Sequence, residues 1–298
     1  MRLSKINLTA AFAFLSIVNI AKSQHKCGSD MHYDRILQEH PEAKLLEDQM
    51  NAEADSKKVE SRAAIYTIPV VFHVIHTNGA ENISRDQILD QMRVLNEDFN
   101  LLNSNRNKLR STFAGLAADC QIKFELAKID PNGICTDGIN RVYSSAGVQM
   151  DMSTEPVKSL IIWPYTKYLN IWVVSSISGG ISGGEILGYA VFPWTAKFSK
   201  DGIVMKSDRV GTIGTSVSSD SGRTLTHEVG HWLGLYHVFQ DDCDNGDKVD
   251  DTPPATGPFT NANCPAAGNS CSTDSPDKLD LWEDYMDYSN GSCQCLFT

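Results

Sequence analysis

The pattern of hydrophobic and polar positions separates a polar N-terminal stretch from a longer part with strand-like runs. Residues 65–75 form a β-branched and aromatic run, which predicts a buried strand. Residues 24–61 are polar and charged, and the helix that 36–54 could form carries little apolar surface. Similar but shorter runs predict further strands at 121–129, 168–174, 187–192 and 202–205.

Two helices are predicted from capping residues and helical spacing. Ser84 can cap the first helix, and Gln87 lies three residues further on, as in a capping box. The second helix is predicted between Gly222 and Gly234. The apolar face of the first helix consists of Ile88, Met92, Leu95 and Phe99.

The first residues have the organisation of a secretory signal peptide. A short basic start is followed by the mostly apolar run 6–20 and then by small residues up to Ser23. The alternative is a membrane anchor, but a span needs about 20 apolar residues and this run is shorter and contains polar side chains. We therefore expect residues 1–23 to be removed and the remaining chain to be a secreted, extracellular protein that does not bind membranes.

Cysteine content and charge agree with an exported protein. The chain has eight cysteines, and five of them lie between Cys243 and Cys295, which is typical of a region held by disulfides. The formal net charge is −11. An excess of acidic groups disfavours nucleic acid and anionic membranes as partners, because both are themselves negatively charged.

The most informative motif is the sequence HEVGHWLGLYH, which begins at His227. On a helix, His227 and His231 are four residues apart and face the same side, so both can bind one metal ion. Gly234 can end the helix and turn the chain so that His237 becomes a third ligand. Three imidazoles leave one position of a zinc ion (Zn2+) open for water, and Glu228 lies where it can take a proton from that water.

The alternative, that these are ordinary core histidines, is weak. In a chain of average composition the whole pattern arises by chance on the order of once in ten thousand or less. Met286 lies downstream between two tyrosines, where metzincin metalloproteases have a tight turn with a methionine beneath the metal. Taken alone, Met286 would more often be part of the core; behind the zinc motif it supports a metzincin.

The chain resembles the pappalysin family of metzincins from Ile65 to its last residue. The resemblance implies a secreted endopeptidase with an α+β metzincin fold. Its upper subdomain would contain a twisted, mostly parallel sheet with backing and active-site helices, and its lower subdomain would be irregular and stapled by disulfides. Only twelve residues follow Met286, where metzincins usually continue into a helix, so the chain is either clipped or lacks that brace. The matching segments, besides the zinc helix, are 68–74, 130–133 with 138–139, 187–193, 250–253 and 286–289.

The resemblance also assigns roles to individual residues. Glu228 is the expected general base, and Tyr288 is similar to a tyrosine that stabilises the tetrahedral intermediate in some metzincins, although it could simply pack. Met286 is structural. We expect the strand 187–192 to form the upper rim of the cleft, where a peptide substrate can add as an extra strand.

Cys27 follows the predicted signal peptide and could close the metal site in a latent form. A thiolate is a good fourth zinc ligand, so an unpaired cysteine in a pro-segment can displace the catalytic water. The alternative is a disulfide between Cys27 and Cys120, Cys135 or Cys295. Because the mature enzymes of the family begin near the position of Arg62, we expect three parts: signal peptide 1–23, pro-segment 24–61 and catalytic domain 62–298.

The resemblance further implies two disulfides and a calcium site. It pairs Cys243 with Cys271 and Cys264 with Cys293. Cys120 could pair with Cys135, which would leave Cys295 without an obvious partner. Among the oxygen-rich residues 244–252, Asp247 and Thr252 best match the segment that binds calcium (Ca2+) in pappalysins; the alternative is a solvated acidic loop.

Three functions are compatible with these residues to different degrees. We expect a monomeric zinc endopeptidase that acts on protein or peptide substrates. A zinc exopeptidase with a distant glutamate ligand is disfavoured because His237 lies at the offset of a third ligand. A catalytically silent binding module that keeps the fold is disfavoured because Glu228 and all three histidines are present. The side-chain preference of the cleft does not follow from the sequence.

Overall fold

The computed structural model describes residues 26–56, 65–145, 148–179, 185–241, 243, 246–259, 264, 267–272 and 276–298. The predicted signal peptide and the expected processing point at Ser61–Arg62 lie outside these residues. The helices are α1 (Ser29–Glu39), α2 (Ala43–Ser56), α3 (Arg85–Phe99) and α4 (Arg223–Trp232). Short 3-10 helices are η1 (Ser104–Lys108), η2 (Ser111–Phe113), η3 (Val157–Ser159), η4 (Pro193–Thr195) and η5 (Ser207–Arg209). The strands are β1 (Lys26–Cys27), β2 (Tyr66–His76), β3 (Ile122–Leu126), β4 (Ile139–Tyr143), β5 (Gln149–Asp151), β6 (Leu169–Val174), β7 (Ser176–Ser178), β8 (Ile186–Ala190) and β9 (Ile203–Lys206).

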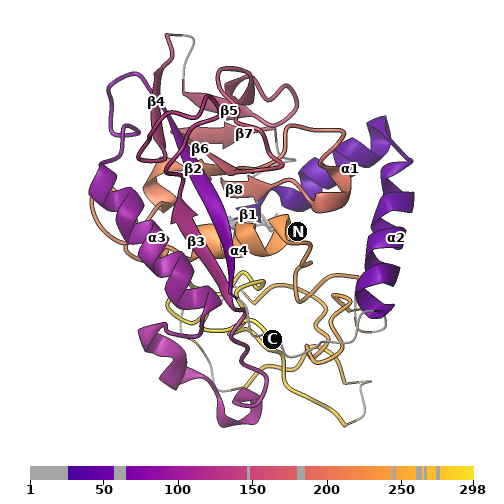
Figure 1. Cartoon of the computed structure of the whole chain (residues 1–298). Helices are drawn as coiled ribbons and strands as arrows, with labels where there is room; N and C mark the ends of the chain where they lie inside the picture. Colours follow the sequence, from indigo (N-terminus) through magenta and orange to yellow (C-terminus); the bar gives the residue numbers. More distant parts are fainter. Residues whose placement is uncertain are drawn as a thin grey trace, which may run out of the picture.

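A twisted, mostly parallel sheet forms the upper part of the molecule (Figure 1). Its strand order is β1-β8-β9-β6-β2-β3, with β4 also paired to β2. Every pair in this sheet is parallel except β8 with β9, which is antiparallel. Within the described residues, no helix combines the length and the apolar character needed to cross a membrane.

The main core lies between the sheet and helices α3 and α4. Alternate residues of β2 point to opposite faces, so Val70, Phe72 and Val74 pack against the two helices, while Ile75 belongs to a second core on the other face. Ser84 caps α3 as predicted, since its hydroxyl accepts a hydrogen bond from the Gln87 amide. The predicted α+β arrangement with backing and active-site helices is thus confirmed.

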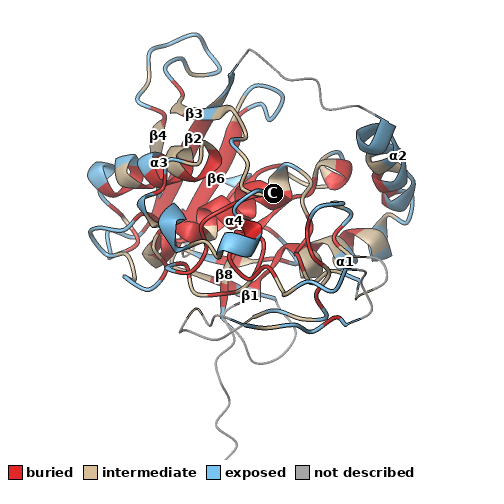
Figure 2. Cartoon of the chain, turned by 90° about the horizontal axis from the view of Figure 1, so that it is seen from below, coloured by how far each residue is buried: buried red, intermediate tan, exposed pale blue. Residues whose placement is uncertain are grey.

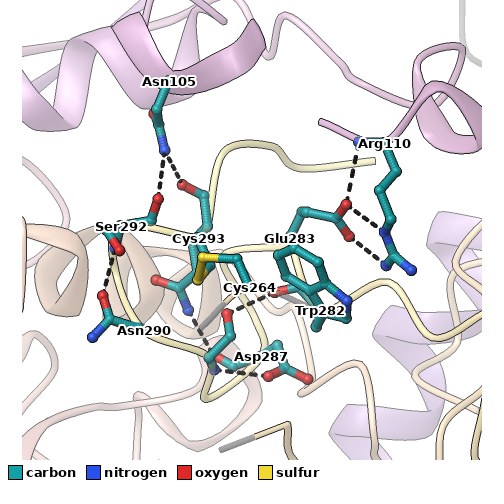
Figure 3. Close-up of a disulfide and its surroundings, with 11 residues drawn as sticks. Asn105, Arg110, Cys264, Trp282, Glu283, Asp287, Asn290, Ser292 and Cys293 are labelled. Carbon is teal, nitrogen blue, oxygen red and sulfur yellow. Dashed lines mark hydrogen bonds and ion pairs between the residues drawn. A yellow bond between two sulfur atoms is a disulfide. The ribbon is translucent and has the colours of Figure 1, made fainter. Parts of the chain in front are cut away.

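The chain after α4 forms the lower part, whose described residues lie mostly in turns, bends and irregular segments. The two disulfides implied by the resemblance are both present, Cys243–Cys271 and Cys264–Cys293. Figure 3 shows polar contacts around the disulfide Cys264–Cys293. Among them, the Arg110 guanidinium donates hydrogen bonds to both carboxylate oxygens of Glu283, at 2.7 and 2.6 Å. Figure 2, seen from below, shows that many residues of this irregular part are buried.

Two possibilities that the sequence left open are not realised in the structure. Cys120 and Cys135 are not bonded to each other; they are free, as are Cys27 and Cys295. The single helix expected at 36–54 is two helices, because the chain breaks at His40 and Pro41. Proline has no amide hydrogen for an intrahelical bond but fits the first turn of a new helix, and the Pro41 carbonyl accepts from the Lys44 amide that opens α2.

Candidate metal centre and substrate cleft

Helix α4 positions the first two histidines of the motif. It begins after Gly222, whose φ of 71° is left-handed, and its last turn is followed by Gly234, whose φ of 101° turns the chain back toward the helix. His237 thereby returns beside His227 and His231. The three Nε2 atoms lie 3.1, 3.1 and 3.2 Å apart, and all three rings are buried. The structure therefore brings together the three predicted ligands.

The hydrogen bonds of the Nδ1 atoms show which nitrogen of each ring carries the proton. His227 Nδ1 lies 2.7 Å from the carbonyl of Tyr285, and His231 Nδ1 lies 2.7 Å from the carbonyl of Leu235. Carbonyl oxygens only accept, so both Nδ1 atoms carry the proton and both Nε2 atoms direct lone pairs at one point. Burial also lowers the pKa of His227 to about 3 and lowers that of His231, which keeps the rings neutral.

A zinc ion fits this donor set. Neutral imidazole nitrogens are preferred zinc ligands, and nitrogens about 2.0–2.1 Å from a tetrahedral ion lie about 3.3 Å from each other. The observed Nε2 separations are close to that value. Without a cation, three converging lone pairs would repel one another in a buried site.

Cys27 lies at the fourth position of the cluster. Its Sγ and the three histidine nitrogens all lie within 4.8 Å of one another, and Cys27 is buried. Strand β1 brings it there by pairing with β8 in parallel, with Cys27 opposite Gly188. Next to it, the Ser29 hydroxyl lies 2.8 Å from the Ala190 amide and accepts its hydrogen bond. Residues close to the N-terminus thus occupy the free edge of the expected rim strand.

Glu228 lies beside the cluster and is buried. Its Oε2 accepts from the Ser29 hydroxyl at 2.9 Å and from the Cys27 thiol at 3.4 Å, while its Oε1 has no hydrogen-bond partner among the described residues. Burial raises the pKa of Glu228 to about 8. A carboxylate with one uncommitted oxygen and a raised pKa has the properties of a general base.

The segment with the predicted methionine passes beneath helix α4. Met286 packs against Gly230, and the preceding carbonyl of Tyr285 is the one that holds His227. Tyr288 is half-buried, and the centroid of its ring lies 4.8 Å from that of His237 and 5.7 Å from that of His227. The structure therefore places both predicted residues at the metal centre.

A buried carboxylate that sequence reasoning missed joins three elements of the site. Asp98 in α3 accepts from Thr226 at 2.7 Å, from the Tyr285 hydroxyl at 3.0 Å and from Arg223. It therefore ties α3 both to α4 and to the turn below it. Asp98 belongs to the polar side of α3 in the sequence, so only its position in the fold reveals this role.

A cavity of about 280 Å³ opens on one side of the metal cluster. Leu187 of the rim and Tyr288 contribute to its wall, and the charged residues Arg209, Asp220 and Arg223 also line it. Burial raises the pKa of Asp220 to about 6, and its Oδ2 has no partner in the described part of the chain. The sequence carries no pattern that would single out these three charged residues.

The two residues expected to bind calcium lie in contact with each other. A hydrogen bond joins Thr252 to the carboxylate of Asp247, and burial raises the pKa of Asp247 to about 6. Among the described residues, however, the one convergent set of at least three histidine, cysteine or acidic ligands is that of the histidines and Cys27. The calcium site stays a prediction.

Comparison with known proteins identifies the family. A family model described as pregnancy-associated plasma protein-A, a peptidase, matches residues 151–298. "Extracellular metalloprotease 1" of Coccidioides posadasii is 30% identical over all of this chain and 94% of its own length, and an extracellular metalloprotease of Colletotrichum graminicola is 32% identical over 98% of this chain and 92% of its own. The chain belongs to the pappalysin family of metzincins. It is therefore a metalloendopeptidase, and zinc is the cofactor that the family implies.

Solved structures agree with this pappalysin over most of its length. A promirolysin mutant of Tannerella forsythia is 36% identical and has a TM-score of 0.79, with 92% of this chain and 90% of that chain covered. Mature mirolysin of the same organism, solved in complex with a cleaved peptide, is 39% identical with a TM-score of 0.71, covering 80% and 88%. These likenesses confirm the metzincin fold predicted from the motif.

Proposed function

We propose that this pappalysin is a secreted endopeptidase in which His227, His231 and His237 hold zinc and Glu228 is the general base. The observation that carries the proposal is the position of Glu228, buried beside three converging imidazole nitrogens and below the rim strand β8. Secretion is supported by the relatives, whose names describe them as extracellular. Its substrates are proteins or peptides.

The chemistry follows from these groups. Bound zinc would supply a Lewis acid that polarises the scissile carbonyl and activates water. Glu228 takes the proton of the attacking water and returns it to the leaving amine. Tyr288, beside two of the three ligand rings, donates a hydrogen bond to the carbonyl oxygen as it gains negative charge. Met286 supports the site from below and takes no part in the reaction.

We further propose that residues 24–61 are a pro-segment and 62–298 the catalytic domain. Three contacts support latency: Cys27 fills the fourth metal position, Ser29 holds the base, and Asp30 lies 3.0 Å from His237 Nδ1. The segment pairs with β8 in parallel. A substrate that adds antiparallel to β8 presents its peptide bonds in the opposite direction, so the pro-segment can fill the cleft without being cut as a substrate.

Calcium is proposed as a second, structural ion at Asp247 and Thr252. The support is the buried carboxylate of Asp247 and its contact with Thr252. Addition of a calcium chelator that leaves zinc in place should lower the melting temperature if this ion is present, and should leave it unchanged if the loop is merely solvated.

The experiment that tests the proposed function is digestion of a denatured protein by the chain after removal of residues up to Ser61. Wild type should cut internal peptide bonds, while a zinc chelator or Glu228→Ala should reduce the rate by about a thousandfold or more. Glu228→Ala should still bind zinc, because the three ligands remain. Glu125→Ala is the matched control, because it removes a half-buried glutamate of β3 that pairs with Lys123, and it should cut normally. A processed, zinc-loaded wild type that cuts nothing would instead support a silent binding module.

A further inference from the structure

Three aromatic side chains form a cluster where the rim strand ends. The rings of Phe192 and Trp194 are stacked, with centroids 4.8 Å apart and planes at 13°, and Tyr236 lies 5.4 Å from Trp194. The cluster borders the metal centre, because the Phe192 ring lies 5.2 Å from the ring of His231. We call Phe192, Trp194 and Tyr236 the aromatic platform.

The aromatic platform is buried, and the residues that cover it belong to the proposed pro-segment. Tyr33 of α1 meets both Phe192 and Trp194 edge-on, at 5.7 and 6.1 Å between centroids, and Leu46 of α2 packs on the same cluster. Figure 1 shows α1 and α2 together on one side of the molecule, with α1 next to β8 and α2 farther out. Removal of residues 24–61 therefore uncovers this cluster of three large aromatic rings.

Two polar groups on the aromatic platform would then need new partners. The Tyr236 hydroxyl donates to Glu47 at 2.5 Å and accepts from Asn51 at 3.2 Å, and both partners lie on α2. The indole N–H of Trp194 has no hydrogen-bond partner among the described residues, although Trp194 is only 3% exposed. A large aromatic surface with unpaired donors, open to solvent beside an active site, is a surface suited to a ligand.

We propose that the aromatic platform binds a large aromatic side chain of the substrate on the N-terminal side of the scissile bond. The inference rests on the proposed function. The covering residue Tyr33 shows the kind of group that fits, because its ring packs edge-on against two platform rings. The platform and the cavity beside Leu187 border different histidines, because Phe192 contacts His231 whereas His227 lines the cavity.

The direction of β8 decides on which side of the cut this residue lies. Strand β8 runs from Ile186 toward Ala190 and continues to Phe192, and Cys27 marks the metal position opposite Gly188. A substrate that is antiparallel to β8 has its N-terminal part over Ala190 and Phe192. At about 3.3 Å per residue, the platform reaches a side chain within about four residues before the cut.

The test uses the zinc-loaded chain processed after Ser61. Its substrates are quenched-fluorescence peptides with one common cleavage site, in which one of the four positions before that site is varied at a time and carries Phe, Lys or Ala. Wild type should cut the Phe peptide with a kcat/KM about tenfold above that of the Ala peptide at one of these positions. Trp194→Ala should bring this ratio close to one. Tyr165→Ala, an exposed tyrosine away from the cleft, is the control and should keep the wild-type ratio.

Three results would overturn the proposal: equal cleavage of all peptides by wild type, a preference for Lys, or an unchanged ratio in Trp194→Ala. If Trp194→Ala does not fold, Trp194→Leu replaces it under the same criteria.

If wild type cuts no peptide, the proposed function fails, and the aromatic platform is tested separately by binding. The fluorescence anisotropy of labelled Phe and Ala peptides with the processed Glu228→Ala variant should then show about tenfold tighter binding of Phe, and equal binding would refute the platform.

Discussion

Gly230 of helix α4 lies so close to Met286 that a Cβ at residue 230 would be 2.3 Å from the methionine Sδ. The helix and the turn below it can approach in this way only because residue 230 has no side chain. The approach has a function, since the carbonyl of Tyr285, next to Met286, holds the Nδ1 of His227 at 2.7 Å. Gly230 and Met286 thereby help to position the carbonyl that orients His227, a proposed zinc ligand.

The first prediction tests this contact. Gly230→Ala forces Met286 out of its position, and we expect a loss of about 1–3 kcal/mol in the free energy of unfolding together with weaker zinc retention. Gly257→Ala is the matched control, because a Cβ there has nothing within 4 Å. Thermal melts and zinc content after dialysis measure both effects. Equal values for Gly230→Ala and wild type would show that Met286 moves aside without cost.

The second prediction concerns the cysteine at the metal position. Cys27→Ala removes the group proposed as fourth ligand, so the pro-segment of the full-length chain should be removed faster, by about tenfold for each 1.4 kcal/mol of lost pro-segment binding. The control is Cys135→Ala, which removes an exposed free cysteine. Processing is followed by the appearance of the mature chain on gels. An unchanged rate for Cys27→Ala would contradict the proposed cysteine switch.

The third prediction concerns a second attachment of the pro-segment, away from the metal. The Glu47 carboxylate accepts hydrogen bonds from Tyr236 at 2.5 Å, from Lys44 at 2.7 Å and from Tyr33. Although burial by itself would raise the pKa of Glu47, the hydrogen bonds from Lys44, Tyr236 and Tyr33 outweigh it and hold this pKa below its usual range.

Glu47→Gln should therefore weaken the docking of α2 and increase the processing rate by about tenfold, since hydrogen bonds to a charged group contribute about 1.5–3 kcal/mol. Digestion of α2 by an added protease provides a second measurement. Glu42→Gln, at an exposed position just before α2, should behave as wild type. If Glu47→Gln also behaves as wild type, the metal-site contacts alone hold the pro-segment.

The fourth prediction is a loss of stability in mild acid that depends on His73. Its Nε2 lies 2.9 Å from Asn170 Oδ1, which also accepts from the Trp163 amide, and its Nδ1 lies 3.2 Å from Asn140 Nδ2. The ring therefore donates at Nε2 and accepts at Nδ1, which only a neutral histidine can do. Burial accordingly lowers the pKa of His73 to about 4.

In the unfolded chain the pKa of His73 is near 6.5, so between pH 6.5 and about 4 the unfolded state binds a proton that the folded state does not. Stability must fall as the pH falls through this window, by up to about 3 kcal/mol. His73→Gln should reduce this slope in urea denaturation measured from pH 7 to 4, whereas His40→Gln, at a more exposed histidine, should not. Parallel curves for wild type and His73→Gln would contradict the prediction.

The predictions agree with the structure for helices and strands whose capping residues or apolar spacing are clear in the sequence. The Ser84 cap and its apolar spacing place α3 correctly, and the long β-branched run at 65–75 is the central strand β2. Strands β1, β4, β5 and β7 were not predicted. They have two to five residues and are partly exposed, so their sequences carry little periodicity, and they are strands because a neighbouring strand offers hydrogen bonds.

The residues of the metal centre differ in the same way. Some could be predicted from nearby sequence, and others are placed by contacts between distant segments. The proposed metal ligands and base are close in sequence: His227, Glu228, His231 and His237. A helix followed by one glycine turn is enough to bring them together. The sequence by itself therefore determined the metal, the family and the proposed base. The positions of Asp98 and the aromatic platform were decided only by the tertiary structure, which also decided for Cys27 between the metal site and a disulfide. Each depends on contacts between segments far apart in the chain, and such contacts leave no spacing that a single sequence can reveal.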